Sequence, residues 1–283
     1  MTEFKSPLGL VLAGGGALGA WQAGALEALT RAGLKFDKVL GFSAGGLSGA
    51  AYTFGFQDEL LDRWRNTSRQ PILRFKPALQ PFALFSGEGV WGSVQNLIDD
   101  EAMKSAARCE LTVMTHRMAD GATVYHRFSP KGERGWDGPL AGRLVAGCAI
   151  PWIFPPVPLE ENGKPELYMD GGIPGKEWMN FDALRDCKDV IVLEMVRPEE
   201  RGAKTYTPVA YYEQLGRETC LRQIESGIES ASRWAAPPRV FRLQPSQRLG
   251  FTMLDFKDWA CVPAVEQGLR DADAFLAQPR VFA

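Results

Sequence analysis

The sequence predicts an α/β fold in which helices flank a central, mostly parallel sheet. Short apolar runs typical of buried strands alternate along the chain with longer stretches of helical periodicity. Glycine-rich turns follow the first two apolar runs, at the points where a strand gives way to a helix. The 283 residues contain no internal repeat, low-complexity tract or clear linker, so we expect a single domain over residues 1–283.

The N-terminal elements form one strand-helix-strand-helix unit. Residues 8–12 are a short apolar strand, and apolar side chains at helical spacing follow over residues 17–32. Residues 38–40 supply the second strand, and a second helix begins after Ser43. Because connections of this kind cross over in a right-handed sense between parallel strands, the unit predicts a parallel sheet.

The middle of the chain is more varied. Residues 58–69 and 93–107 carry helical patterns. Residues 71–85 hold three prolines among large apolar side chains, so they cannot form a regular helix. A hairpin is expected around the Asp-Gly turn at residues 120–121, and a further helix over residues 140–150.

The C-terminal elements return to an alternation of strands and helices. A short extended run enters Asp170, and residues 190–195 are typical of a strand buried in a parallel sheet. The remaining elements expected are a helix over residues 211–234, a strand over 240–243 and a closing helix over 264–277.

Charge and cysteine content exclude several classes of function and location. The formal net charge is −2 and the sequence pI is near 5.9, which argues against a nucleic-acid partner, because such proteins carry a basic surface. The five cysteines are odd in number and form no C-x-x-C pair, so we expect reduced thiols in a cytoplasm. No apolar run approaches the ~18 residues of a spanning helix. We therefore expect a cytoplasmic protein that meets a membrane only at its surface.

A serine lies in the G-x-S-x-G pattern of a nucleophile elbow. Gly41 and Gly45 flank Ser43, directly after the second predicted strand. In such an elbow the glycines allow a sharp turn that holds the hydroxyl up and exposed. A serine hydroxyl is a weak nucleophile until a base takes its proton, so the pattern predicts a base nearby.

Histidine, the usual base, is scarce in this chain. His116 and His126 are the only two, and they sit on opposite arms of the predicted hairpin. A hydrolase triad in the order Ser, Asp, His would need a histidine in the C-terminal half. His126 could still reach Ser43 in space, but a surface or hairpin-packing role is favoured for both histidines.

Asp170 is the other candidate for the base. It ends a short extended run and is followed by Gly171 and Gly172, which let a second loop approach closely. Taken alone, the sequence is equally typical of an ordinary Asp-Gly turn. An unperturbed carboxyl with a pKa of ~3.9 is a poor proton acceptor, so a catalytic Asp170 requires a dry site that raises its pKa.

The first glycine-rich turn allows two interpretations. Gly14, Gly15 and Gly16 begin a G-x-G-x-x-G run that follows a strand and opens a helix, which is the dinucleotide-binding fingerprint. That fingerprint also needs an acid at the end of the second strand, whereas Asp37 precedes this strand and Ser43 stands at its end. The alternative is an oxyanion hole, because unpaired N–H groups at a helix start stabilise developing negative charge.

Three motifs together identify a resemblance to the patatin-like phospholipase family. They appear in the family's order as Gly14-Gly15-Gly16-Ala17-Leu18-Gly19, Gly41-Phe42-Ser43-Ala44-Gly45 and Asp170-Gly171-Gly172. Residues 149–156 also resemble the family's proline-containing block, so the likeness covers about residues 8–172. Two positions depart from the pattern: Leu18 stands where the family has Arg or Lys, and the family's N-x-P is missing after Gly172.

The resemblance implies the three-layer α/β architecture of that family and a Ser-Asp dyad without histidine. Ser43 would be the acylated nucleophile, Asp170 the base and the N–H groups of Gly14 to Gly16 the oxyanion hole. Gly41, Gly45, Gly171 and Gly172 would support the two catalytic turns. The substrates implied are acyl esters of lipids, with no metal and no cofactor.

Two apolar segments are candidates for contact with a lipid. Trp152, Ile153 and Phe154 could line an acyl pocket, and residues 71–85 could form a lipid-facing flap. Packing against the core is the simpler explanation for aromatic side chains in loops. Two other functions stay open from the sequence: a nucleotide-binding oxidoreductase, and a lipid-binding relative that has lost catalysis.

Overall fold

The chain is described by a computed structural model over residues 4–94, 98–132, 135–161, 163–173 and 175–278. In this part of the chain a sheet of eight strands has the order β10-β9-β1-β2-β5-β8-β7, and β6 pairs with β5. The strands are β1 (Leu8–Leu12), β2 (Lys38–Phe42), β5 (Glu110–Arg117), β6 (Thr123–Phe128), β7 (Val157–Glu161), β8 (Lys164–Asp170), β9 (Asp189–Leu193) and β10 (Arg239–Leu243).

Five neighbouring strands, from β10 through β9, β1 and β2 to β5, run parallel, whereas β6, β7 and β8 are antiparallel additions. The prediction of a mostly parallel sheet flanked by helices is therefore confirmed. The central strands β1 and β9 are buried along their whole length, which explains why both are continuous apolar runs rather than alternating patterns.

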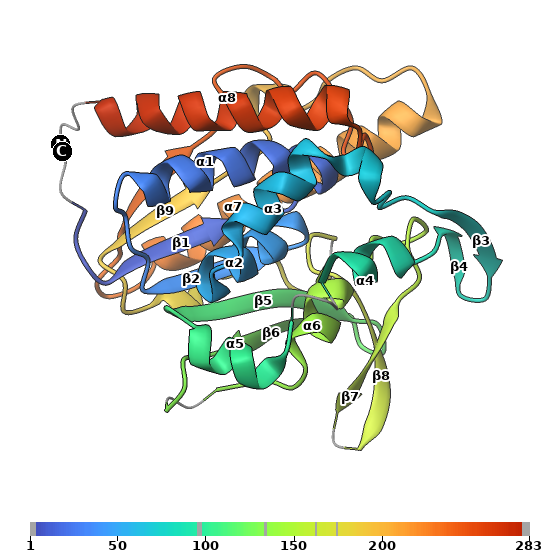
Figure 1. The fold of residues 1–283 in the computed structure, drawn as a ribbon, viewed down its shortest axis with the longest axis horizontal. Helices are drawn as coiled ribbons and strands as arrows, with labels where there is room; N and C mark the ends of the chain where they lie inside the picture. Colours follow the sequence, from blue (N-terminus) through green and yellow to red (C-terminus); the bar gives the residue numbers. More distant parts are fainter. Residues whose placement is uncertain (1–3, 95–97, 133–134, 162, 174, 279–283) are drawn as a thin grey trace.

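The helices are α1 (Gly19–Arg31), α2 (Ala44–Phe54), α3 (Gln57–Arg65), α4 (Glu88–Val94), α5 (Asp100–Ala106), α6 (Leu140–Gly147), α7 (Pro208–Ser232) and α8 (Asp258–Ala277). α1 and α2 follow strands that step in one direction across the sheet, and α7 joins strands that step in the other direction. Right-handed crossovers therefore place α7 on the opposite face from α1 and α2. Figure 1 shows α8 lying along α1, and α7 passing behind the strands.

Most predicted elements are found with shifted ends. The helix expected over residues 58–69 ends at Arg65, because Asn66 leaves the helical conformation and a 3₁₀ turn, Thr67–Arg69, follows. The helical pattern of residues 93–107 divides between α4 and α5, and residues 95–97 lie outside the described residues. Strand β7, which pairs with β8, was not expected from the sequence.

The proline-rich segment of residues 71–85 is ordered rather than irregular. It forms an antiparallel hairpin of β3 (Phe75–Leu79) and β4 (Phe82–Phe85) that projects from the body of the molecule (Figure 1). The proline within β3 is tolerated because this strand lies outside the main sheet and pairs only with β4. None of the described helices is both long enough and apolar enough to cross a bilayer.

Candidate active site

Ser43 occupies a strained turn between β2 and α2. Its backbone angles are φ 54° and ψ −131°, a conformation that side chains rarely adopt, and the helix begins at the next residue. Both flanking glycines are required by close backbone contacts. A Cβ on Gly45 would lie 2.1 Å from the carbonyl oxygen of Leu12, and one on Gly41 would lie 2.5 Å from that of Gly45.

The register of the sheet brings Asp170 to this turn. β2 ends with Phe42 paired to Met114 of β5, and β8 pairs with the next part of β5, where Asp170 is opposite Thr115. The residue that follows Phe42 is Ser43, so the two catalytic candidates meet although they come from distant parts of the sequence. Their side chains form a hydrogen bond.

The electrostatic environment of Asp170 suits a base at neutral pH. The side chain is only 3% exposed, and desolvation raises its pKa from 3.8 to about 7. Two hydrogen bonds oppose this rise, because the hydroxyl of Ser43 and the N–H of Gly172 both donate to the carboxylate. The N–H of Gly172 lies 2.7 Å from Oδ1 and orients the group.

The glycine loop lies directly beside the serine. A Cβ placed on Gly14 would stand 2.8 Å from the Cβ of Ser43. Gly16 has a φ of 54° and lines the same cavity as Ser43. Within the described residues, the N–H groups of Gly14, Gly15 and Gly16 donate to no protein acceptor. The loop beside Ser43 thus carries three N–H groups without a protein acceptor.

The two histidines are buried in the β5–β6 hairpin and bond to other groups. His126 Nε2 lies 2.8 Å from Oγ1 of Thr115, and burial lowers its pKa to about 4. His116 Nε2 lies 2.8 Å from the carbonyl oxygen of Ile173. Among the described residues, neither imidazole forms a hydrogen bond with Ser43.

His116 and Gln223 hold the turn that follows Asp170. Gln223 Nε2 donates to the carbonyl oxygens of Gly171 and Ile173, each at 3.1 Å. From the sequence, His116 was expected only in a surface or hairpin-packing role, and Gln223 was not expected at the site. Gln223 carried no motif, because its role depends on α7 crossing the turn, and a single histidine on a strand gives no signal of a loop-holding role.

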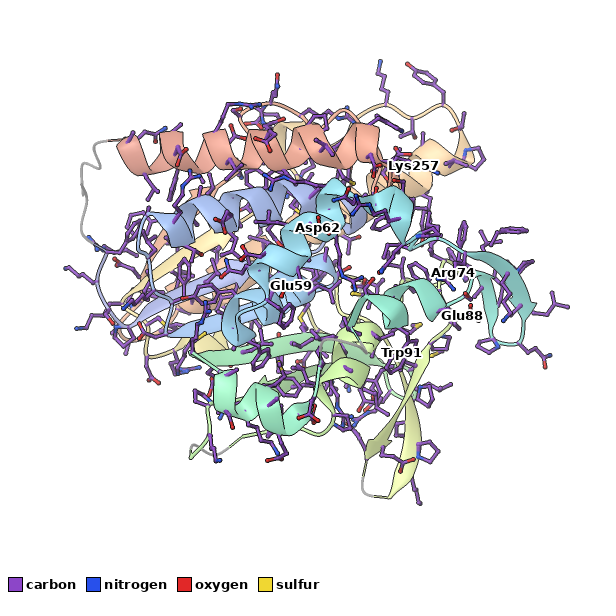
Figure 2. All side chains as sticks on the ribbon, viewed as in Figure 1. Glu59, Asp62, Arg74, Glu88, Trp91 and Lys257 are labelled. Atoms are coloured by element: carbon purple, nitrogen blue, oxygen red, sulfur yellow. The ribbon has the colours of Figure 1, made fainter. Side chains whose placement is uncertain are left out.

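A cavity of about 640 Å³ opens beside Ser43, within the size range of small-molecule sites. Its apolar lining comes mainly from α2, α3, α4 and α6, together with Phe256. Charged and polar side chains of the lining are Asp58, Glu59, Asp62, Arg63, Asn66, Thr67, Arg69, Gln70 and Ser93. Figure 2 shows two of them, Glu59 and Asp62, on α3, with Trp91 on the facing helix α4. An apolar interior with a polar margin is suited to a chain-bearing amphiphile.

The three acyl-pocket candidates lie in different environments. Phe154 lines the cavity, whereas Ile153 is buried in the core outside the cavity lining. Trp152 is 60% exposed, has a φ of 65° and packs against Tyr212, with ring centroids 6.0 Å apart. The structure thus brings one of the three to the cavity beside Ser43, and their contact with substrate stays a prediction.

The β3–β4 hairpin exposes large apolar side chains close to this cavity. Phe75 is 73% exposed and Leu79 is 86% exposed. The hairpin is bonded to the residues that precede Phe154 of the cavity lining, since the N–H groups of Leu84 and Phe85 donate to the carbonyl oxygens of Trp152 and Ile153, both at 2.9 Å.

Asp37, the acid considered for a dinucleotide site, lies away from the glycine loop. Asp37 accepts a hydrogen bond from the N–H of Leu8, at the start of β1, whereas the loop follows the end of that strand. Among the described residues, no group of three or more His, Cys, Asp or Glu side chains is arranged to hold a metal ion. All five cysteines are free and buried.

Comparisons with known proteins identify the family of the chain. The model of the patatin-like phospholipase family matches residues 10–174, which is more than half of the chain. An uncharacterized NTE family protein of Mycobacterium tuberculosis is 30% identical over 232 residues, covering 79% of this chain and 36% of the relative. Human patatin-like phospholipase domain-containing protein 6 is 25% identical over 207 residues, covering 70% of this chain and 14% of the relative.

Among solved structures, VipD from Legionella pneumophila is similar at 15% identity and a TM-score of 0.48, with 96% of this chain and 67% of that chain covered. The chain spans about a third or less of the two curated relatives described above. The matched residues include the glycine loop, Ser43 and Asp170; Gly16 and Ser43 line the cavity, and Asp170 interacts with Ser43. The chain therefore belongs to the patatin-like phospholipase family.

Proposed function

We propose that the protein is a serine lipid acyl hydrolase that cleaves carboxylic esters of phospholipids or related acyl lipids. The observation that carries the proposal is the buried Asp170 carboxyl, hydrogen-bonded to Ser43 and with a pKa raised to about 7. Such a group is basic enough to take a hydroxyl proton and acidic enough to return it to a leaving alcohol at neutral pH. Membership of the family supports the same general activity.

The proposed reaction has two halves. Asp170 takes the proton of Ser43 as the serine oxygen attacks the ester carbonyl, and the N–H groups of Gly14, Gly15 and Gly16 stabilise the oxyanion. The intermediate collapses to an acyl-enzyme, and Asp170 returns the proton to the departing alcohol. Water then attacks the acyl-enzyme with Asp170 again as base, which releases the fatty acid and regenerates Ser43.

The cavity supports a lipid substrate. Its apolar lining, which includes Phe154, would take a hydrocarbon chain, and its charged margin would face a polar head group. The family's usual basic residue in the glycine loop is replaced by Leu18, which is completely buried, so this position offers no cation to a head group. Transfer of the acyl group to an alcohol would use the same acyl-enzyme with a different acceptor.

Contact with a membrane surface belongs to the same proposal. The hairpin presents exposed apolar side chains next to the cavity, and Arg74 and Lys76 lie at its base, each paired with Glu88. Side chains of this kind partition into the interface of a bilayer. Transient docking there would bring the cavity to its substrate, from a cytoplasmic location.

Hydrolysis assays on two variants test the proposed function. Ser43→Ala removes the nucleophile, and Asp170→Asn keeps the shape of the base but removes its basicity. Each is expected to lower kcat for an acyl ester by about 10³-fold or more, in protein that unfolds cooperatively like the wild type. Wild-type turnover in either variant would exclude the dyad.

A further inference from the structure

A buried ion cluster is centred on α7, outside the segment that the family model matches. Its contacts extend through the segment of residues 251–253 to the glycine loop. Arg217 is its centre and is only 2% exposed. Its guanidinium donates to Glu213 at 2.8 Å, to Glu200 at 2.8 Å and to the carbonyl oxygen of Phe251 at 2.6 Å. A buried cation with carboxylate and carbonyl partners on all sides holds those partners in fixed positions.

The cluster forms hydrogen bonds with two backbone groups in the segment of residues 251–253. Arg217 binds the carbonyl oxygen of Phe251. The N–H of Met253 donates to both carboxylate oxygens of Glu213, each at 3.0 Å. The Met253 side chain also packs on α7, since a Cβ on Gly216 would stand 3.1 Å from its sulfur.

Met253 in turn fixes the glycine loop. Its carbonyl oxygen accepts a hydrogen bond of 2.8 Å from the N–H of Ala17. A Cβ on Gly16 would lie 2.2 Å from the same oxygen, and Gly16 has a φ of 54°. Only glycine therefore fits at residue 16, where the loop packs directly against the Met253 carbonyl.

We propose that Glu213 and Arg217 are positioning residues for the oxyanion-binding loop, acting through the backbone of Met253. This inference rests on the proposed function. N–H groups of an oxyanion hole stabilise the transition state more than the bound substrate, so a shift of the loop lowers kcat and leaves KM nearly unchanged. A purely structural role for the cluster would not produce that separation.

The test compares three variants on the same helix. Glu213→Ala removes the acceptor for the N–H of Met253, and Glu213→Gln keeps one acceptor oxygen. The matched control is Glu229→Ala, because Glu229 pairs with Arg233 at the same i, i+4 spacing but on an exposed surface. Glu213 is preferred to Arg217 as the target, since removing the arginine would leave the buried Glu200 with only the half-exposed Arg248 as its cation.

Glu213→Ala is expected to lower kcat by at least about tenfold, within the ~10²–10³ that loss of a complete oxyanion donor costs. KM should stay within about twofold, Glu213→Gln should recover part of the loss, and Glu229→Ala should match the wild type. Hydrogen exchange gives a readout independent of activity: the amide of Ala17, which donates to the Met253 carbonyl oxygen, should exchange faster in Glu213→Ala than in Glu229→Ala.

The outcomes separate this inference from the proposed function. If Ser43→Ala, measured in parallel, keeps ester hydrolysis, the proposed function fails. If Ser43→Ala is inactive but Glu213→Ala turns over like Glu229→Ala, the positioning role is wrong. A loss of kcat without faster exchange at Ala17 also overturns it, because Glu213 would then act somewhere other than the loop.

Discussion

At the scale of single residues, the site depends on where one carboxyl group is buried. No cation contributes to the shifted pKa of Asp170. Desolvation is the largest cause and raises the pKa, whereas the hydrogen bonds from Ser43 and Gly172 lower it. The pKa of about 7 is therefore a consequence of the apolar core around the end of β8. The same burial that makes the group a useful base also makes its ionised form unfavourable for the folded state.

Because the ionised carboxyl of Asp170 is unfavourable in the folded state, Asp170→Asn is expected to differ in stability from the wild type. The folded-state pKa is raised from 3.8, so the folded protein binds the proton more tightly, and stability falls as pH rises from about 4 to about 7. Above this range the buried carboxylate costs at most ~4 kcal/mol. Thermal unfolding should therefore show a higher Tm for Asp170→Asn than for the wild type at about pH 8, and the difference should shrink toward pH 4. A lower Tm for the variant at pH 8 would mean that Asp170 is not desolvated.

Sequence reasoning named Ser43, Asp170 and the three loop glycines because each belongs to a local motif. It could not name Gln223, Glu213 or Arg217. Those side chains act on backbone groups of segments far away in the chain, and nothing in their own neighbourhood of the sequence marks them.

At the scale of elements, the elbow between β2 and α2 shows how little space the turn leaves. Gly45 and Gly46 are adjacent at the start of α2, but only Gly45 lacks the space for a side chain. A Cβ on Gly45 would meet the Leu12 carbonyl oxygen at 2.1 Å, whereas one on Gly46 would find its nearest neighbour, a methyl group of Val113, at an ordinary 3.6 Å.

Substitution of the two glycines by alanine is therefore expected to have opposite effects on the stability of the protein. Gly45→Ala should destabilise the protein by about 1–3 kcal/mol and disturb the elbow. Gly46→Ala should be neutral, or stabilising by up to about 1 kcal/mol, because alanine favours the helix. Urea unfolding with an ester-hydrolysis assay measures both. Equal behaviour of the two variants would show that the elbow is less tightly packed against β1 than described.

The order of strands and helices was predictable, since apolar runs and helical periodicity are local properties. The β3–β4 hairpin was not, because three prolines within residues 71–85 mask any strand pattern. Strand β7 was missed for a similar reason: its burial alternates over only five residues, and three prolines immediately precede or interrupt it.

At the scale of the whole molecule, the apolar hairpin and the cavity lie close together. The backbone of β4 bonds to residues 152–153, and Phe154 lines the cavity. In the proposed membrane contact, a hairpin resting on a lipid surface would hold the cavity close to that surface. The net charge of −2 gives no general attraction to anionic lipids, so apolar contact has to supply the binding.

Vesicle binding should therefore depend on the hairpin. Replacing Phe75, Leu79 and Phe82 together by Ser, in a Ser43→Ala background that prevents hydrolysis, should weaken binding to phosphatidylcholine vesicles at least about tenfold. Met118, which follows β5, and Leu167, within β8, are exposed apolar residues outside this hairpin, and replacing them by Ser serves as the control. Sedimentation with vesicles measures the partition. Unchanged binding of the hairpin variant would remove the membrane-docking role.

The central claim is that a carboxyl group, and not an imidazole, activates Ser43. The rate at which a fluorophosphonate labels Ser43, measured from about pH 5 to about pH 9 with mass mapping of the label, tests it most directly. The wild type should show a rise with a midpoint near 7, the pKa of Asp170, because the pKa of His126 is about 4 and burial also lowers that of His116. Asp170→Asn should label far more slowly and without that rise. Labelling of Asp170→Asn at the wild-type rate, with the same midpoint, would contradict the account.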